Sequence, residues 1–428
     1  MVILRAPTSS CPLVDEGLYA PVRNVFAMAD VCLVNALFPP DKHGGAENYV
    51  LRTAHGLQER GHDVAVITSK PYDGPASLRP SEGTYEGIPV WRFYPANLSH
   101  LSNSTGDNVL EKAVWRGIDL VNVHASTTVG RVLDRLDPAV VHTNNLFGIS
   151  TLVGRAVQRR DIRHVHTLHD YGLVCPKSNL LRDLTAPDDE RVVCEDPPLP
   201  CRAYAKQRRV TLGTPDLVTA PSQHVIDVHR DHGFFTGVDT QRLRLGIDGV
   251  ADAPPSIADE RSVLYVGQQL ESKGLETLFT AADLLPEITF HICGSGPYAD
   301  RTEEAAAERD NLQYHGFVST ETLDELRRAA AAAVVPSIWM ENSPMTIYES
   351  YAVGLPVIGS DIGGIPELID VGETGYLFDP KDADGLASAI ERLFDADRAA
   401  LQRNALAWAE DHTMTAHVDR LVGEVYDL

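Results

Sequence analysis

The sequence predicts an α/β protein made of two doubly wound domains. Short apolar runs typical of buried strands alternate with stretches of helical spacing, a pattern that favours parallel sheets covered by helices. The 428 residues exceed what one ordinary hydrophobic core holds. A segment containing Gly and Pro, 246–256, separates two halves that share this pattern. The predicted units are a flexible extension at 1–28, a first domain at 29–248, a second domain at 249–412, and a C-terminal helix at 413–428 that can pack back on the first domain.

Apolar runs of strand length define the predicted sheets. In the first half they are Val31–Ala36, Asp63–Thr68, Val90–Tyr94, Ala139–His142, His164–Leu168 and Leu217–Ala220. In the second half they are Val263–Gly267, Ile288–Cys293, Leu312–His315, Ala332–Pro336 and Pro356–Ser360. Apolar spacing predicts helices at 46–60, 275–285, 320–330, 344–353, 383–395 and 414–427. Each half is therefore expected to form one parallel sheet with helices on its faces.

Composition excludes several classes of partner. The formal net charge of −23 argues against nucleic acid and against an anionic membrane as the main partner. No apolar run is long enough to predict a transmembrane helix, and the first 28 residues lack the pattern of a secretory signal. Six cysteines in a chain of this length do not predict a disulfide framework. A cytoplasmic protein is expected.

Three loops that follow predicted strands could hold a phosphorylated ligand, because ligands bind beyond the carboxyl ends of parallel strands. Gly44 and Gly45 allow backbone N–H groups to approach a ligand closely. Lys273 can place an ammonium beside a diphosphate. Gly294 begins a Gly-Ser-Gly turn that matches only part of a dinucleotide fingerprint. Each signal taken alone also fits an ordinary loop or a solvated lysine.

The most specific segment contains two carboxylates, Glu341 and Glu349, on either side of a predicted helix start. Ser343 is a favourable N-cap residue and Pro344 suits the first helical position. The free N–H groups of such a helix end, together with its dipole, favour an anion. A ligand with phosphates at the helix end and sugars on both sides would meet both carboxylates, which is the shape of a sugar nucleotide.

These motifs together resemble the retaining glycosyltransferases of family four, which have the GT-B fold of two Rossmann-like domains facing a central cleft. The resemblance runs from about Val31 to the C-terminus. It rests on the Glu-x7-Glu segment with the following Gly354-Leu-Pro and Gly363-Gly-Ile-Pro-Glu, and on the early Gly-Gly-Ala-Glu and the Lys273-Gly pair. The resemblance implies that the second domain binds a nucleotide sugar and that the acceptor enters from the first.

The resemblance also assigns roles to residues. It implies a catalytic set in which Glu341 contacts the transferred sugar, Lys273 holds the diphosphate and His169 faces the donor sugar. Glu349 is expected to bind the ribose. The full set of donor-binding residues that it implies is Gly44, Gly45, Gln268, Gly294, Phe317, Val318, Ser343, Pro344, Met345, Thr346 and Glu349.

One position departs from the family pattern. The family usually has Arg where this chain has Gln268, which carries no charge. Stabilisation of the leaving diphosphate is then expected from Lys273, from backbone dipoles and from an arginine elsewhere in the chain.

The function implied is transfer of a hexose from a nucleotide-diphosphate sugar to a glycan or lipid-linked acceptor, with retention of configuration, in the synthesis of cell-surface polysaccharide or glycoconjugate. No cofactor or metal is expected, and no nucleic acid partner. A lipid-linked acceptor would bring the protein into peripheral contact with the inner face of the membrane. The alternatives are a nucleotide-sugar epimerase or a phosphorylase on the same fold, and a non-catalytic partner that keeps the pocket.

Two further groups of residues have competing interpretations. His169 follows a predicted strand, where a histidine bonded to backbone is the alternative to a functional one. Cys175, Cys194 and Cys201 fall in one loop region without a Cys-x2-Cys pair. Free thiols are the expected state there, and a zinc site lacking a fourth ligand is the alternative.

Overall fold

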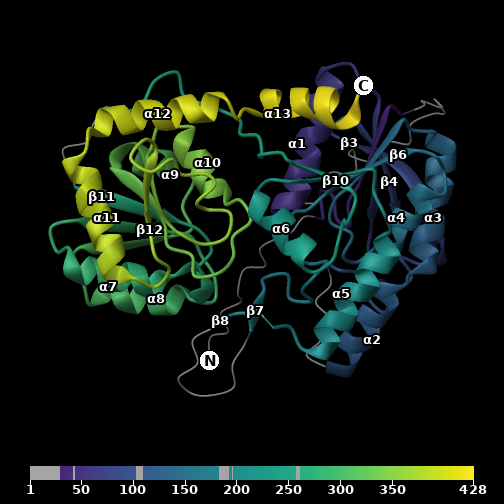
Figure 1. Ribbon diagram of the computed structural model, residues 1–428, viewed down its shortest axis with the longest axis horizontal. Helices are drawn as coiled ribbons and strands as arrows, with labels where there is room; N and C mark the ends of the chain where they lie inside the picture. Colours follow the sequence, from purple (N-terminus) through teal and green to yellow (C-terminus); the bar gives the residue numbers. More distant parts are fainter. Residues whose placement is uncertain (1–28, 42–43, 103–108, 183–191, 195, 257–260) are drawn as a thin grey trace, which may run out of the picture.

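The computed structural model describes residues 29–41, 44–102, 109–182, 192–194, 196–256 and 261–428. The extension predicted at 1–28 lies outside the described residues. Two α/β lobes stand next to each other, each with its own sheet (Figure 1). The predicted fold class is confirmed.

The first domain contains an eight-stranded sheet in the order β10-β9-β6-β5-β1-β2-β4-β3. Its strands are β1 (Val31–Val34), β2 (Val64–Ser69), β3 (Ser81–Tyr85), β4 (Ile88–Phe93), β5 (Val140–Thr143), β6 (Arg163–Thr167), β9 (Leu217–Ala220) and β10 (Asp239–Arg242). All neighbours pair in parallel except β3 and β4, which form an antiparallel hairpin at the edge. The helices are α1 (Gly45–Glu59), α2 (Val109–Leu120), α3 (Val123–Leu136), α4 (Leu152–Gln158), α5 (Leu199–Leu212) and α6 (Gln223–Asp231). A small separate pair joins β7 (Leu181–Arg182) and β8 (Val192–Val193).

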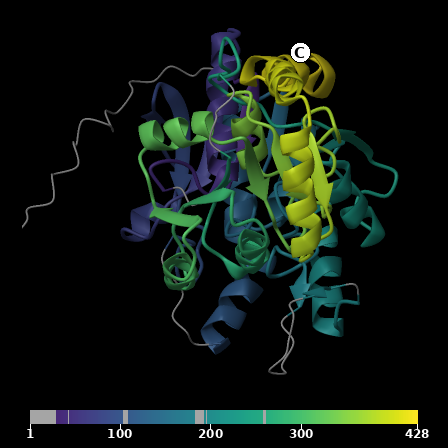
Figure 2. The ribbon, with the colours of Figure 1, turned by 90° about the vertical axis from the view of Figure 1, so that its left-hand side faces the viewer.

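The second domain contains a six-stranded parallel sheet in the order β13-β12-β11-β14-β15-β16. Its strands are β11 (Ser262–Val266), β12 (Thr289–Cys293), β13 (Leu312–Gly316), β14 (Ala332–Val335), β15 (Val357–Ser360) and β16 (Gly375–Phe378). Its helices are α7 (Leu275–Leu284), α8 (Ala299–Ala307), α9 (Thr320–Ala329), α10 (Met345–Tyr351), α11 (Ala383–Asp395) and α12 (Arg398–Glu410). Two separate apolar clusters form on this sheet, one around α7 and α11 and one around α10 and α12. Figure 2 shows helices on both sides of the sheet, as expected for a doubly wound domain.

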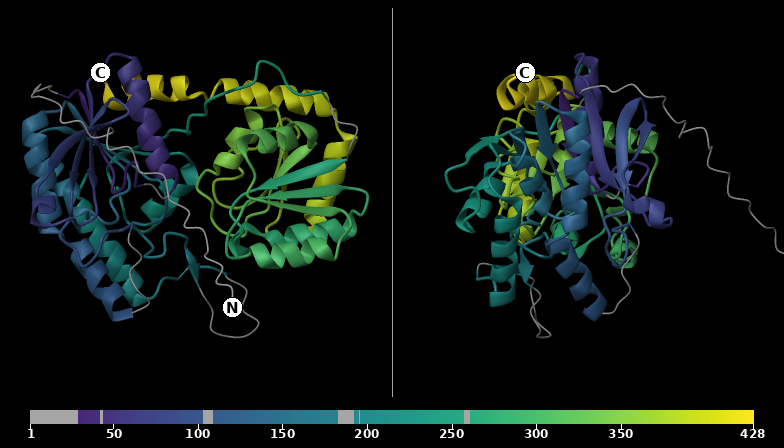
Figure 3. Two further views of the ribbon diagram at one scale, coloured as in Figure 1. Left: turned by 180° about the vertical axis from the view of Figure 1, so that it is seen from behind. Right: turned by 90° about the vertical axis from the view of Figure 1, so that its right-hand side faces the viewer.

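The end of the chain returns to the first domain. Helix α13 (Met414–Arg420) and the π-helical turn Leu421–Tyr426 follow α12 and lie beside α1 (Figures 1 and 3). Apolar side chains of this segment belong to the same buried cluster as β1 and α1. A Cβ atom at Gly56 would lie 2.7 Å from Val418 Cγ2, so the glycine permits the close approach of α1 and α13.

The observed strands can be compared with the strands predicted from the sequence. Each of the eleven predicted apolar runs contains all or most of an observed strand. Of the strands in the described residues that were not predicted, β3, β10 and β16 lie at sheet edges, and β7 and β8 form the small separate pair. β3 and β10 are polar and partly exposed, so they lack the apolar run that marks a buried strand. β16 is apolar and largely buried, and its four residues were missed. Within the described part of the chain, no helix combines the length and apolar character needed to cross a bilayer.

Candidate functional site

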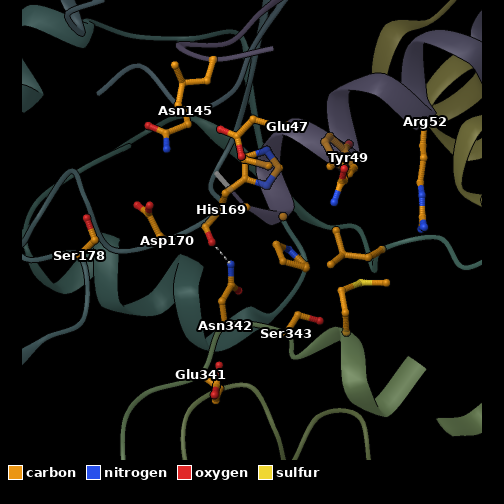
Figure 4. A pocket seen from close by; sticks show the side chains of 18 of the residues that line it. Glu47, Tyr49, Arg52, Asn145, His169, Asp170, Ser178, Glu341, Asn342 and Ser343 are labelled. Carbon is orange, nitrogen blue, oxygen red and sulfur yellow. Dashed lines mark hydrogen bonds between the residues drawn. The ribbon is translucent and has the colours of Figure 1, made fainter. Parts of the chain in front are cut away.

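A cavity of about 600 Å³ lies between the two domains, and both contribute to its walls. The first domain supplies the start of α1 and the loop after β6, and the second supplies the loop between β14 and α10. Figure 4 shows Glu47, His169 and Asp170 on one side and Asn342, Ser343 and Glu341 on the other. The cavity therefore lies at the carboxyl ends of central strands of both sheets, where ligands of such folds bind.

Glu341 is the most heavily hydrogen-bonded acidic group of the second-domain wall. Its Oε1 atom accepts hydrogen bonds from Lys273 Nζ at 2.5 Å, Ser337 Oγ at 2.8 Å and Trp339 Nε1 at 2.8 Å. The residue is only 6% exposed. The Lys273 ammonium also lies over the Trp339 ring, 5.1 Å from its centroid. These contacts fix the carboxylate in one orientation beside a cation.

Glu349 lines the same cavity from α10 and is held by an arginine of α9. Its Oε2 accepts a hydrogen bond from Arg327 Nη2, and Arg327 also lies 3.6 Å from Asp324. The Arg327 side chain is 8% exposed, whereas that of Glu349 is 40% exposed. The glutamate thus presents its accessible side to the cavity while its partner stays buried.

The start of α10 differs from the prediction. Ser343 was expected to cap the helix with Pro344 at its first position, but the helix begins at Met345 and Pro344 is the capping residue. The Ser343 hydroxyl instead bonds to the hydroxyl of Tyr348 at 2.9 Å. The buried tyrosine hydroxyl needs a partner, and it competes successfully with the backbone N–H groups for the serine.

His169 forms the facing wall, directly after β6. Its Nε2 is hydrogen-bonded to Asn144 Oδ1 at 2.8 Å, and its ring packs edge-on against Tyr49 with centroids 4.9 Å apart. The Nε2 atom of His169 is therefore bonded to a side chain and not to the backbone, which was the alternative. Burial lowers the pKa of His169 to about 4, so the ring is neutral at pH 7. Burial also raises the pKa of the neighbouring Asp170 carboxyl.

Asn342 connects the two walls. Its Nδ2 donates to the backbone oxygen of His169 at 2.8 Å, the bond drawn in Figure 4, and its Oδ1 accepts from Ser222 Oγ at 3.0 Å. A second bridge involves Glu367, which accepts from the backbone N–H groups of Gln223 and His224 at the start of α6. The bond from Asn342 to His169 holds the loop that carries Glu341 against the strand end that carries His169, and the Glu367 bonds join the second domain to α6.

The structure brings half of the predicted site residues to the cavity. The predicted residues that line it are Gly44, Gly45, His169, Glu341, Ser343, Met345 and Glu349. Lys273 contacts Glu341 directly, and Thr346 Oγ1 donates to the backbone oxygen of Val266.

Other predicted residues lie farther from the cavity lining. Gln268 and Phe317 are exposed, the latter by 86%, and Val318 packs on the apolar cluster around α10. Gly294 has φ +130°, and a Cβ there would lie 1.8 Å from the backbone oxygen of Gly267. A glycine at 294 is therefore required by the close approach of two loops.

Comparison with known proteins identifies the family. A family model described as Glycosyl transferase 4-like domain matches residues 44–244, and one described as Glycosyl transferases group 1 matches residues 251–408. The chain belongs to the group 1 glycosyltransferases and has the GT-B fold. The two matched ranges correspond to the two domains of the structure.

Three relatives place this group 1 glycosyltransferase further. It is 23% identical over 363 residues to an uncharacterized 42.6 kDa protein in the cps region of Klebsiella pneumoniae, covering 85% of this chain and 93% of that one. It is 28% identical to glycogen synthase of Mycobacterium tuberculosis, covering 88% of each chain. The crystal structure of Anabaena HepE in complex with UDP superposes with a TM-score of 0.63 at 17% identity, covering 93% of this chain and all of that one.

Several lining residues of this glycosyltransferase were not predicted. They are Tyr49, Arg52, Asn145, Asp170, Tyr171, Ser178, Leu245, Gly246, Trp339, Asn342 and Met414, among others. Trp339 and Asn342 lie within two positions of Glu341 in the sequence, which is a signal that could have found them. Arg52 lies on α1, two turns after the Gly-Gly pair. Helical spacing gives the residues that share its face, but it does not say whether that face meets the cavity. Met414 comes from the C-terminal segment that returns to the first domain, and no local sequence pattern indicates where that segment packs.

The three loop cysteines were weighed as a zinc site. Cys175, Cys194 and Cys201 are partly buried free thiols. Burial raises the pKa of the Cys201 thiol, and Cys175 and Cys194 act in the same direction. Among the described residues, no group of three or more His, Cys, Asp or Glu side chains is arranged to hold a metal ion. The zinc alternative therefore has no ligand set in the described part of this loop.

Proposed function

We propose that this glycosyltransferase moves a hexose from a nucleotide-diphosphate sugar to a glycan or lipid-linked acceptor, with retention of configuration. One observation carries the proposal: Glu341, Glu349 and His169 line a single cavity between the domains. Two carboxylates from one domain and a neutral imidazole from the other suit a ligand that has hydroxyl groups at both ends. Sugar hydroxyls are donors to carboxylates, and a neutral imidazole can donate or accept.

The donor is proposed to lie along the second-domain wall. Glu349 would accept hydrogen bonds from the ribose, Lys273 would hold the diphosphate, and Glu341 would orient the hexose. The backbone N–H groups at the start of α1 support this placement, because its N-cap residue is Gly44, which has no side chain to satisfy them. Phe317 and Val318 would flank the base. The HepE structure contains UDP, which makes a uridine donor the first to test.

The chemistry follows from the charges that develop in the reaction. The anomeric C–O bond to the diphosphate breaks as positive charge builds on the sugar, and the acceptor oxygen bonds to the same face. The acceptor proton passes to the departing phosphate oxygen, so atoms and charges balance without an enzyme nucleophile. The ammonium of Lys273 would stabilise the departing charge, which is the largest contribution expected. The proposed reaction needs no metal ion, because cations of the protein, of which Lys273 is one, would stabilise the departing diphosphate.

The acceptor is proposed to enter from the first domain. Asn145, Asp170 and Ser178 line the part of the cavity farthest from α10 in Figure 4, and a smaller cavity of about 70 Å³ continues from it past Phe147. Polar groups at such an opening suit a glycan. The relative in the cps region supports a role in surface polysaccharide synthesis, at the cytoplasmic face of the membrane where the acceptor is lipid-linked.

The proposal is tested with purified protein and a panel of UDP-, ADP- and GDP-sugars, each with and without glycan acceptors. Release of nucleoside diphosphate that depends on the acceptor, with an anomeric configuration in the product equal to that of the donor by NMR, is the expected result. Epimerised nucleotide sugar without an acceptor would show the epimerase alternative. Donor binding without any release of diphosphate, equal in the unmodified protein and Glu341→Gln, would show a non-catalytic protein.

A further inference from the structure

The cavity has an uneven charge balance. Among its lining residues in the described chain, four carry carboxylates, which are Glu47, Asp170, Glu341 and Glu349. Arg52 is the one lining residue with a permanent positive charge in that part of the chain. A phosphorylated ligand would be repelled by this surface unless a cation compensates it. Arg52 is therefore placed where such a ligand most needs a partner.

Two cations of the second domain, Lys273 and Arg327, are already engaged within that domain. Lys273 Nζ lies 2.5 Å from Glu341 Oε1, and Arg327 is bonded to Glu349. Both pairs have a side chain that is 8% exposed, so separating them would leave a buried charge without its partner. A diphosphate carries at least two negative charges, more than a single shared ammonium neutralises.

Arg52 is engaged only weakly. Its Nε lies 3.3 Å from Asp248 Oδ2, and the two side chains are 42% and 58% exposed. Ion pairs with this degree of exposure contribute little, because water screens them. In Figure 4 the side chain extends away from α1. An exposed arginine side chain has several rotatable bonds, so it can change partner without movement of the helix. Asp248 lies in the segment that joins the two domains, beside Ile247, which bonds to His412 and Met414.

We propose that Arg52 is a phosphate-binding residue of the cavity, and that it exchanges Asp248 for a phosphoryl group when substrate binds. The inference rests on the proposed function. A phosphoryl group offers more charge and more acceptor oxygens than one carboxylate, and the planar guanidinium matches two of those oxygens. The phosphoryl group belongs either to the diphosphate of the donor or to a phosphorylated acceptor.

Two variants with opposite expected effects test the exchange. Arg52→Met removes the cation and is expected to weaken binding of a nucleoside diphosphate about tenfold or more. Asp248→Asn removes the competitor for Arg52 and is expected to leave this affinity equal or up to a few-fold stronger. Arg301→Met is the matched control, because Arg301 forms a similarly exposed ion pair with Glu276 away from the cavity. It is expected to change nothing.

The measurement is isothermal titration with UDP, ADP and GDP, with the corresponding nucleosides, and with glucose 6-phosphate. A loss for the diphosphates but not the nucleosides in Arg52→Met places Arg52 on the donor. A loss confined to glucose 6-phosphate places it on the acceptor phosphate. Unchanged affinity for every phosphorylated probe, or equal weakening in Arg52→Met and Asp248→Asn, would overturn the inference.

The outcome is separable from failure of the proposed function. If the unmodified protein binds a diphosphate and Arg52→Met binds it equally well, only the role of Arg52 is wrong. If the unmodified protein binds none of the phosphorylated probes, both proposals are rejected. Thermal unfolding of each variant without ligand shows whether it is folded, and a lowered melting temperature with unchanged affinity would mark the Arg52 pair as structural.

Discussion

The two walls of the cavity hold their polar groups in different ways. On the second-domain wall, Glu341 and Glu349 are each paired with a cation of their own domain. On the first-domain wall, the central group is His169, whose pKa is lowered to about 4 by burial. The second-domain wall therefore presents carboxylates that are each paired with a cation of the same domain, whereas the first-domain wall is centred on a neutral imidazole. The paired carboxylates are fixed acceptors for sugar hydroxyl groups, and a neutral imidazole can donate or accept a hydrogen bond.

The first-domain wall around His169 is supported by the C-terminal segment of the chain. Tyr49 packs against His169, and its hydroxyl lies 3.1 Å from His417 Nε2 in α13. His142 is bonded on one side to Tyr426 at 2.6 Å and on the other to Thr167 at 2.6 Å. Tyr49 and His417 are 368 positions apart in the sequence, and His142 and Tyr426 are 284 positions apart. The last fifteen residues thus form part of the support of the first-domain wall, although α12, just before them, belongs to the second domain.

The largest expected effect is a loss of stability in acid that begins in the first domain. Burial lowers the pKa values of His164, His169, His229 and His417 to about 4, below the ordinary value near 6.5 in an unfolded chain. Between these values the unfolded state binds more protons, so the stability from these neutral rings is fully present above about pH 6.5 and falls as the pH drops towards 4. Each ring contributes up to about 1.4 kcal/mol per pH unit.

The acid effect is measured by urea unfolding at pH 7 and pH 5. Trp91 and Trp115 report the first domain, and Trp339 and Trp408 the second, in paired Trp→Phe variants. His417→Gln is expected to reduce the pH slope of the first domain. If the second domain unfolded at a higher pH than the first, the prediction that the buried neutral histidines make the first domain sensitive to acid would be contradicted.

The sequence predicted much of the fold and part of the site, and the division has a physical cause. Central strands are buried on both faces, so their apolar runs predicted them, and the Glu341–Glu349 segment lies within one local motif. Ser343 was predicted to cap the helix because local spacing favoured it, but its hydroxyl is hydrogen-bonded to the buried hydroxyl of Tyr348 instead. Arg52 and Met414 reach the cavity through packing of distant segments. Local patterns contain no information on such contacts.

The proposed role of the second-domain wall is tested most strongly by the variant Lys273→Ala. Loss of this ammonium removes the proposed stabilisation of the leaving diphosphate and is expected to lower turnover about 10²-fold or more. Ser337→Ala is the control, because it removes a neutral donor from the same Glu341 oxygen. A much smaller effect of Ser337→Ala would show that charge rather than orientation of Glu341 matters. Single-turnover rates of Lys273→Ala equal to those of the unmodified protein would reject the role of Lys273.

A smaller effect is expected for Glu349→Ala, which separates binding from chemistry on the same wall. The proposed ribose contact is made equally in the ground and transition states, so its loss should raise the donor KM about tenfold and change kcat little. Asp324→Asn is the matched control, since Asp324 also pairs with Arg327 but does not line the cavity. If both variants raise KM equally, Arg327 rather than the ribose contact is responsible. A fall in kcat larger than the rise in KM would move Glu349 from the nucleotide to the reacting sugar, and the fixed charges of this wall would then serve the chemical step as well as the nucleotide.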